Sequence, residues 1–208
     1  MESCKSNQYL FDWIILHEGL EAMPVNHADN VIYHDVGTHG IARLHGARIS
    51  AALDLDDELT LNLTQTFVDS LGAHPKLLVD LKPTMGTVFA DYLVNYSHWS
   101  WGDVDMIVGD MVGWVDLAEL EDFDIFTYTF GDNERLYTRG QFAVHRNTPR
   151  INALWQACPE LSTNVYIEAQ RHTGVTERCY PYAVAQSGTA LHARAVRCPH
   201  THTHTFLV

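Results

Sequence analysis

The strongest constraint on the fold is that short strand-like segments alternate along the chain with segments of helical spacing. Apolar or alternating runs of strand length occupy residues 11–16, 30–37, 98–111, 124–130 and 140–147. Helical spacing of apolar residues, or a proline placed at a helix start, marks residues 41–53, 83–94 and 149–159. Alternation of this kind predicts a mixed α/β sheet domain.

Composition narrows the class of protein and of partner. The 208 residues suffice for one domain with a substantial core, and 46% hydrophobic against 19% charged residues is typical of a globular chain. A formal charge of -13 argues against a nucleic-acid partner, because phosphate binding needs a basic surface. A nucleotide can still bind if a divalent cation lies between the negative charges.

Targeting signals leave the compartment open. The chain has no apolar run of the ~18 residues expected of a membrane span, so we expect no span. Its first residues lack the basic start and long apolar core of a signal peptide. The compartment is therefore unknown from the sequence, and the cytoplasm, or a Golgi-type lumen if the N-terminus is incomplete, would both fit.

The cysteines and the last residues carry weaker signals. None of Cys4, Cys158, Cys179 and Cys198 forms a C-x-x-C pair, and the three that lie from residue 158 onward leave a disulfide open there. The run "HTHTHT" could bind a metal, but a simple DNA repeat also encodes alternating His and Thr, and we favour that origin. We therefore expect one domain over residues 1–186 and an irregular tail over residues 187–208.

A pair of carboxylates in the stretch "HWSWGDVDMIVGDM" carries the main chemical signal. Asp103 and Asp105 stand two residues apart, so on a strand they share one face at about 6.6 Å along the chain. They repel one another unless a proton or cation lies between them. Mg2+ and Mn2+ suit one or two carboxylates together with substrate phosphates. D-x-D alone is common, and a solvated strand end is the competing interpretation.

Three motifs together suggest a family. "DLKPTMG", "FADYLVNYSHWSWGDVDMIVGDM" and "GQFAVHRNTPRIN" occur in this order, and the chain from Ser3 to Asn152 resembles a family of largely uncharacterised, glycosyltransferase-like proteins from bacteria and some microbial eukaryotes. Members of that family resemble nucleotide-sugar-dependent enzymes of the GT-A fold. The resemblance implies an α/β, GT-A-like mixed sheet with flanking helices, here without the first strand.

The resemblance also implies roles for particular residues. Asp103 and Asp105 would bind Mn2+ or Mg2+ and, through it, the nucleotide sugar. Asp80 and Lys82 would lie beside the nucleotide or its diphosphate, although a surface lysine at a helix start is an equally open interpretation of Lys82. For Asp110 we favour a structural cap on the following segment over a direct ligand role.

Two further positions concern the acceptor side of such a site. Gln141 stands where the family has His, so it keeps hydrogen bonding without imidazole chemistry. Arg146 and Asn147 could face the acceptor or order the turn from strand to helix, and we favour the second role. Trp99 and Trp101 could stack on a sugar, but we expect them in the core.

The resulting hypotheses differ in class. The first is a metal-dependent glycosyltransferase that moves a sugar from a nucleotide-diphosphate donor to a carbohydrate or glycan acceptor. The second is a non-catalytic remnant or carbohydrate-interaction domain of the same fold, which the missing first strand favours. A phosphatase of the aspartyl-phosphate type is disfavoured, because "HWSWG" rather than an apolar run precedes Asp103. No catalytic base stands out by spacing.

Overall fold

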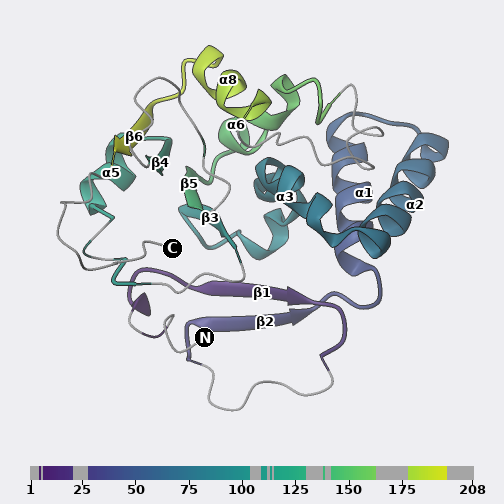
Figure 1. Cartoon of the computed structure of the whole chain (residues 1–208), viewed down its shortest axis with the longest axis horizontal. Helices are drawn as coiled ribbons and strands as arrows, with labels where there is room; N and C mark the ends of the chain where they lie inside the picture. The colour runs from purple at the N-terminus through teal and green to yellow at the C-terminus, as the bar shows by residue number, and fades with distance from the viewer. Residues whose placement is uncertain are drawn as a thin grey trace, which may run out of the picture.

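The computed structural model describes residues 5, 7–20, 28–103, 109–111, 113, 115–129, 138, 142–162 and 178–195. Two sheets and a set of mostly short helices make up this part of the chain (Figure 1), so the predicted mixed α/β class is confirmed. Asp105 and Gln141 lie outside the described residues. None of the described helices combines the length and apolar character needed to cross a bilayer.

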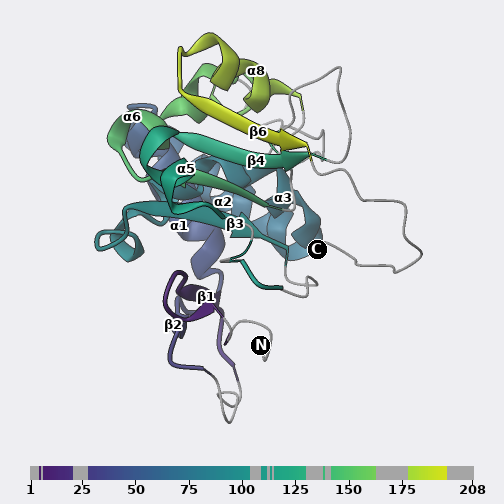
Figure 2. The same cartoon turned by 90° about the vertical axis from the view of Figure 1, so that its left-hand side faces the viewer.

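The N-terminal sheet has two parallel strands, β1 (Trp13–His17) and β2 (Val31–Asp35), paired from Trp13 with Val31 to His17 with Asp35. Gly19 and Gly37 follow the two strands with positive φ, which lets the backbone turn away after each one. Figures 1 and 2 both show this sheet below the rest of the molecule. The two predicted strands are thus confirmed, with boundaries that shift by one or two residues.

A helical pair, α1 (Gly40–Ala52) and α2 (Asp57–Ala73), follows. Asp56 caps α2 by accepting a hydrogen bond from the Leu59 amide at 2.8 Å, and two acidic residues in the first turn suit the helix dipole. Gly46 permits close packing, because a Cβ there would lie 2.6 Å from the Thr64 Cα. The pair buries apolar side chains from both helices in the main core, among them Ile49, Leu63, Phe67 and Leu71.

The larger sheet has the order β3-β5-β4-β6. Its strands are β3 (His98–Gly102), β5 (Phe142–Arg146), β4 (Ile125–Thr129) and β6 (Leu191–Ala195). β5 runs antiparallel to both neighbours, and β6 runs parallel to β4. The helices around it are α5 (Leu117–Asp122), α6 (Pro149–Asn152), η5 (Leu154–Ala157) and α8 (Cys179–Gln186), and η5 packs against α8.

The prediction of one continuous helix over residues 83–94 was wrong. The chain instead forms short pieces: η2 (Pro75–Leu77), α3 (Leu78–Leu81), η3 (Lys82–Thr84), α4 (Met85–Val88) and η4 (Ala90–Tyr92). Pro83 has no amide proton to donate, and Gly86 is a weak helix former, so neither supports a long helix. The helix expected over residues 149–159 is likewise split into α6 and η5.

The segment expected to be irregular from residue 187 onward contains a strand. β6 pairs with β4 from Leu191 with Ile125 to Ala195 with Thr129. The amides of Asp124 and Ile125 both donate to the Ala190 carbonyl at the start of this pairing, at 2.8 and 3.2 Å. Residues 191–195 thus form a strand because they pair with the edge of β4, although their own sequence shows no strand pattern. Residues 196–208, which include "HTHTHT", lie outside the described residues.

Candidate functional site

The motif "DLKP" places two charged side chains in the interior. Asp80 lies in α3 and Lys82 begins η3, and only 1% and 5% of their surfaces are exposed. Pro83 fixes the backbone at the start of η3, and the Thr84 hydroxyl donates to the Leu81 carbonyl at 2.7 Å. The burial of Lys82 rules out its interpretation as a surface lysine.

The end of the same motif docks onto strand β3. A Cβ at Gly86 would lie 2.7 Å from Trp99 Cε2 and 2.6 Å from Asn152 Oδ1, so only glycine allows this approach. The Trp99 indole nitrogen donates to Asn152 Oδ1 at 2.8 Å. Gly86 lies four residues after Lys82, and Trp99 lies four residues before Asp103. This contact therefore positions the chain so that Lys82 lies near the end of β3.

Asp103 directly follows β3 and receives the Lys82 ammonium. Lys82 Nζ donates a hydrogen bond to Asp103 Oδ1, in an ion pair whose carboxylate side chain is 31% exposed. A buried ammonium needs such a partner, because removing it from water without one costs several kcal/mol or more. The structure therefore brings together Lys82 and Asp103, with Asp80 two residues from Lys82 along the chain. Asp105, the second carboxylate of the motif, lies outside the described residues.

The segment after the carboxylate pair is held by a residue that sequence reasoning missed. The buried Asn7 side chain donates to the Gly109 carbonyl at 2.9 Å and accepts from the Met111 amide at 2.8 Å. Asp110, between these two residues, accepts from the Gly113 amide at 3.2 Å, which is a local capping contact. A polar residue more than a hundred positions away carried no spacing signal that could have predicted this clamp.

Arg146 ties the sheet to α5. Its Nη2 donates to the carbonyls of Leu120, Glu121 and Phe123 at 2.9, 2.6 and 3.1 Å, and its Nε lies 3.3 Å from Asp124 Oδ1. These contacts occupy the carbonyls at the C-terminal end of α5, where a cation is favourable. The guanidinium therefore orders local structure.

Asn147 and Asn152 connect the third motif to the other two. Asn147 Nδ2 donates to the carbonyls of Leu93 and Tyr96 at 2.8 and 2.9 Å, and Asn152 Nδ2 donates to Asn147 Oδ1 at 2.8 Å. Since Asn152 also accepts from Trp99, the network links β3, β5 and α6. The three motifs on which the family resemblance depends thus pack against one another.

A buried histidine lies opposite Trp99 on the neighbouring strand of the sheet. His145 on β5 stacks on Trp99 with ring centroids 4.3 Å apart and lies 4.6 Å from the Trp101 ring. Burial lowers the pKa of His145 to about 3, so the ring is neutral at physiological pH. Trp99 and Trp101 are both buried, as expected of core residues. Within the described part of the chain, neither His145 ring nitrogen nor the Tyr180 hydroxyl has a hydrogen-bond partner.

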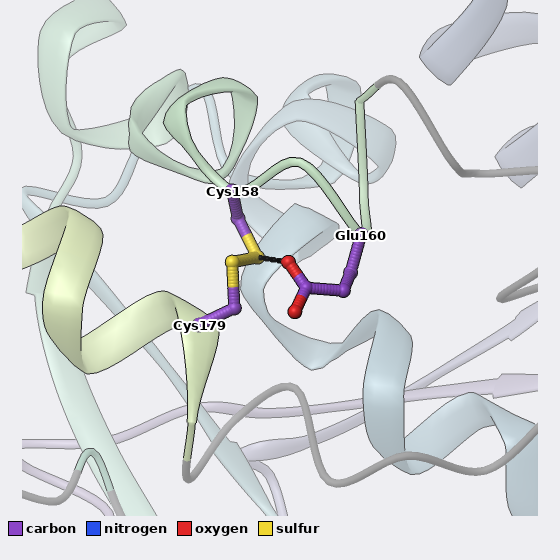
Figure 3. A group of neighbouring side chains, drawn as sticks. All are labelled: Cys158, Glu160 and Cys179. Carbon is purple, nitrogen blue, oxygen red and sulfur yellow. Dashed lines mark hydrogen bonds between the residues drawn. A yellow bond between two sulfur atoms is a disulfide. The ribbon is translucent and has the colours of Figure 1, made fainter.

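A group of potential metal ligands also lies outside the D-x-D stretch, whose Asp105 falls outside the described residues. Among the described residues, Cys158, Glu160 and Cys179 form a group whose ligand atoms all lie within 4.8 Å of one another (Figure 3). The two cysteines are joined in a disulfide, which bears out the possibility left open by the cysteine positions. The predicted acidic site needs fewer protein ligands, because substrate phosphates complete the shell of Mg2+ or Mn2+.

Comparison with known proteins adds a family. Residues 1–193 match the model of a family of unknown function (DUF6625). No curated protein and no solved structure is significantly similar to the chain.

Proposed function

The chain belongs to this family of unknown function, and from its residues we propose that it is a metal-dependent glycosyltransferase of GT-A type. The donor is a nucleotide-diphosphate sugar and the acceptor is a carbohydrate or glycan. One observation carries the proposal: Lys82, from the "DLKP" motif, donates a hydrogen bond to Asp103, the first residue of the D-x-D motif, at the end of β3.

A lysine beside a carboxylate suits a diphosphate with its cation. In this proposal Asp103 and Asp105 hold Mn2+ or Mg2+ through their oxygens, which are the ligands these ions prefer. The bound cation supplies neutralisation of the negative charge on the departing diphosphate. Lys82, which pairs with Asp103 in the structure, would offer its ammonium to a phosphate oxygen of the donor.

The resemblance to GT-A enzymes supports the same assignment. The "DLKPTMG" motif, the D-x-D stretch and the "RNTPRIN" segment are brought into contact by Gly86, Trp99 and Asn152. Strand ends in α/β sheets are frequent ligand sites, and Asp103 directly follows a strand. Asp110, Gln141 and Arg146 are assigned no chemical step, and Arg146 is already engaged with α5.

A screen of nucleotide sugars for Mn2+-dependent hydrolysis tests the proposal. We expect turnover by the wild-type chain that chelation abolishes, and at least a ~100-fold loss in Asp105→Ala, comparable to removing a group that stabilises charge in the transition state. The matched control is Asp69→Asn, since Asp69 is an exposed carboxylate on α2 that accepts only a side-chain hydrogen bond from Gln65 among the contacts described. Equal turnover in wild type and Asp105→Ala would discard the metal assignment.

Binding separates the enzyme from the alternative of a non-catalytic remnant. Isothermal titration of nucleoside diphosphates with and without Mn2+ should show metal-dependent binding that Lys82→Met weakens. A folded chain, verified by circular dichroism, that binds no nucleoside diphosphate with Mn2+ would overturn the proposal and favour the remnant or carbohydrate-interaction domain.

A further inference from the structure

Two cysteines and a glutamate meet between η5 and α8, away from the D-x-D motif in the sequence. Cys158 follows η5, Cys179 is the first residue of α8, and the two form a disulfide with Cα atoms 5.5 Å apart. Figure 3 shows the Glu160 carboxylate pointing at the sulfur of Cys158. Cys158 is buried, while Cys179 and Glu160 are partly exposed.

Among the described residues, the Glu160 carboxylate makes only weak contacts while the cysteines are joined. Glu160 Oε2 lies 3.6 Å from Cys158 Sγ, but a disulfide sulfur carries no proton to donate. The carboxylate's other described contact is Arg178, whose Nη2 lies 4.0 Å from Oε1 and whose side chain is largely exposed. An exposed ion pair at this distance contributes little to stability. The placement of Glu160 therefore points to the state in which the sulfur atoms are free.

We propose that reduction of the Cys158–Cys179 disulfide opens a zinc site formed by these two cysteines and Glu160. A dithiol reductant supplies two electrons and two protons, its own sulfurs become a disulfide, and the protein S–S bond breaks to give two thiols. Zn2+ then displaces the two thiol protons and binds both thiolates and the carboxylate. The fourth tetrahedral position is left to water.

The spacing of the three side chains fits this ion. Tetrahedral zinc holds thiolates at about 2.3 Å and carboxylate oxygens at about 2.0–2.2 Å, so neighbouring ligand atoms lie roughly 3.5–3.8 Å apart. The three ligand atoms here already lie within 4.8 Å of one another. Small side-chain rotations after reduction are enough to complete the geometry. Thiolates also select zinc over Mg2+ or Mn2+, which keeps this site distinct from the proposed donor site.

Electrostatics favours occupation of the reduced site. Reduction places two ionisable thiols beside the Glu160 carboxylate, and like charges this close repel unless protons or a cation lie between them. Zn2+ removes that repulsion. Because the ion binds only the reduced chain, its binding pulls the disulfide equilibrium toward reduction, so the site couples metal binding to redox state.

Cobalt titration of a simplified chain tests the proposal. In a Cys4→Ser/Cys198→Ser background only the proposed pair remains, and a phosphine reductant avoids competing thiols. We expect the reduced chain to bind one Co2+ with thiolate-to-cobalt charge-transfer absorption that Zn2+ bleaches, and the oxidised chain to show no such band. Far-UV circular dichroism checks that the reduced chain stays folded.

Variants identify the third ligand. Glu160→Gln should weaken Co2+ and Zn2+ binding by about tenfold or more, whereas Glu58→Gln, at an exposed carboxylate in the first turn of α2, should leave binding unchanged. Cys179→Ser should remove the charge-transfer band. The proposal is overturned if the folded, reduced chain shows no band, if Glu160→Gln binds as tightly as its parent, or if reduction unfolds the chain and zinc does not restore it. None of these readouts depends on sugar transfer.

Discussion

Arg146 and Asn147 show how a motif residue can serve the fold. Their side chains are occupied by backbone carbonyls, three at the end of α5 for Arg146 and two near η4 for Asn147. Lys82 and Asp103 differ, because they pair with each other and the Asp103 side chain is partly exposed to solvent. Within one set of motifs, the proposed chemistry therefore rests on the "DLKP" and D-x-D residues.

Arg146→Lys should lower the free energy of unfolding by about 1.5–3 kcal/mol. A lysine has a single ammonium and cannot reproduce the guanidinium geometry that reaches the α5 carbonyls and Asp124. Arg150→Lys is the matched control, since Arg150 pairs with the same aspartate but is exposed, and its loss should stay below about 0.5 kcal/mol. Urea denaturation measures both, and equal losses would contradict the structural role of Arg146.

The sequence could identify the motif residues, but it could not tell which of them serve the fold and which lie at the candidate site. The order and spacing of the motifs identified Asp80, Lys82 and Asp103, and the structure brings the last two together. Asn7 and His145 carried no signal, because a lone polar residue reveals neither a long-range clamp nor a stacked position against a tryptophan. Glu160 was not identified from the sequence for the same reason: its position beside the cysteines depends on Cys179, 19 residues away, which only folding brings near.

At the scale of elements, local pattern succeeded where one periodicity dominated. Strands β1, β2, β4 and β5 and helix α1 appear where alternating or helical spacing predicted them. It failed where proline, glycine and aromatic residues follow one another from Pro83 to Val94, because tertiary contacts such as that of Gly86 with Trp99 fix the backbone there. It also failed at β6, which is ordered by pairing with β4.

Gly46→Ala should destabilise the α1–α2 pair by about 1–3 kcal/mol. The added methyl would lie 2.6 Å from the Thr64 Cα, which belongs to backbone and cannot rotate away, so the helices must separate. Gly72→Ala, in α2, meets nothing within 4 Å and should instead gain about 0.5–1 kcal/mol from helix propensity. Thermal unfolding followed by circular dichroism measures both. A Gly46→Ala chain as stable as wild type would refute the close packing.

Cys158→Ala/Cys179→Ala should lower the free energy of unfolding by about 3 kcal/mol. The disulfide joins residues 21 positions apart, between η5 and α8, and closing a loop of this size restricts the unfolded chain by that amount. Reductant without metal should destabilise the wild type and leave the double variant unchanged. If the wild type is insensitive to reductant in urea denaturation, the disulfide does not contribute to stability.

For the whole molecule, buried histidines connect stability to pH. Burial lowers the pKa of His45 to about 4 and that of His145 to about 3, against 6.5 for an unperturbed histidine. Both rings are neutral in the folded chain down to these values, whereas the unfolded chain takes up protons below about pH 6.5. The unfolded state therefore binds more protons as pH falls, so stability is full above pH 6.5 and declines below it.

The free energy of unfolding should fall by about 3 kcal/mol between pH 7.5 and pH 5.5. Each buried histidine contributes about 1.4 kcal/mol for the one pH unit below 6.5, and both act in the same direction. Urea denaturation at several pH values measures the slope. His145→Gln should remove about half of the slope whatever it does to stability at pH 7.5, with His74→Gln, at an exposed position after α2, as the control. An unchanged slope in His145→Gln would show that the ring stacked on Trp99 can be protonated without unfolding the chain.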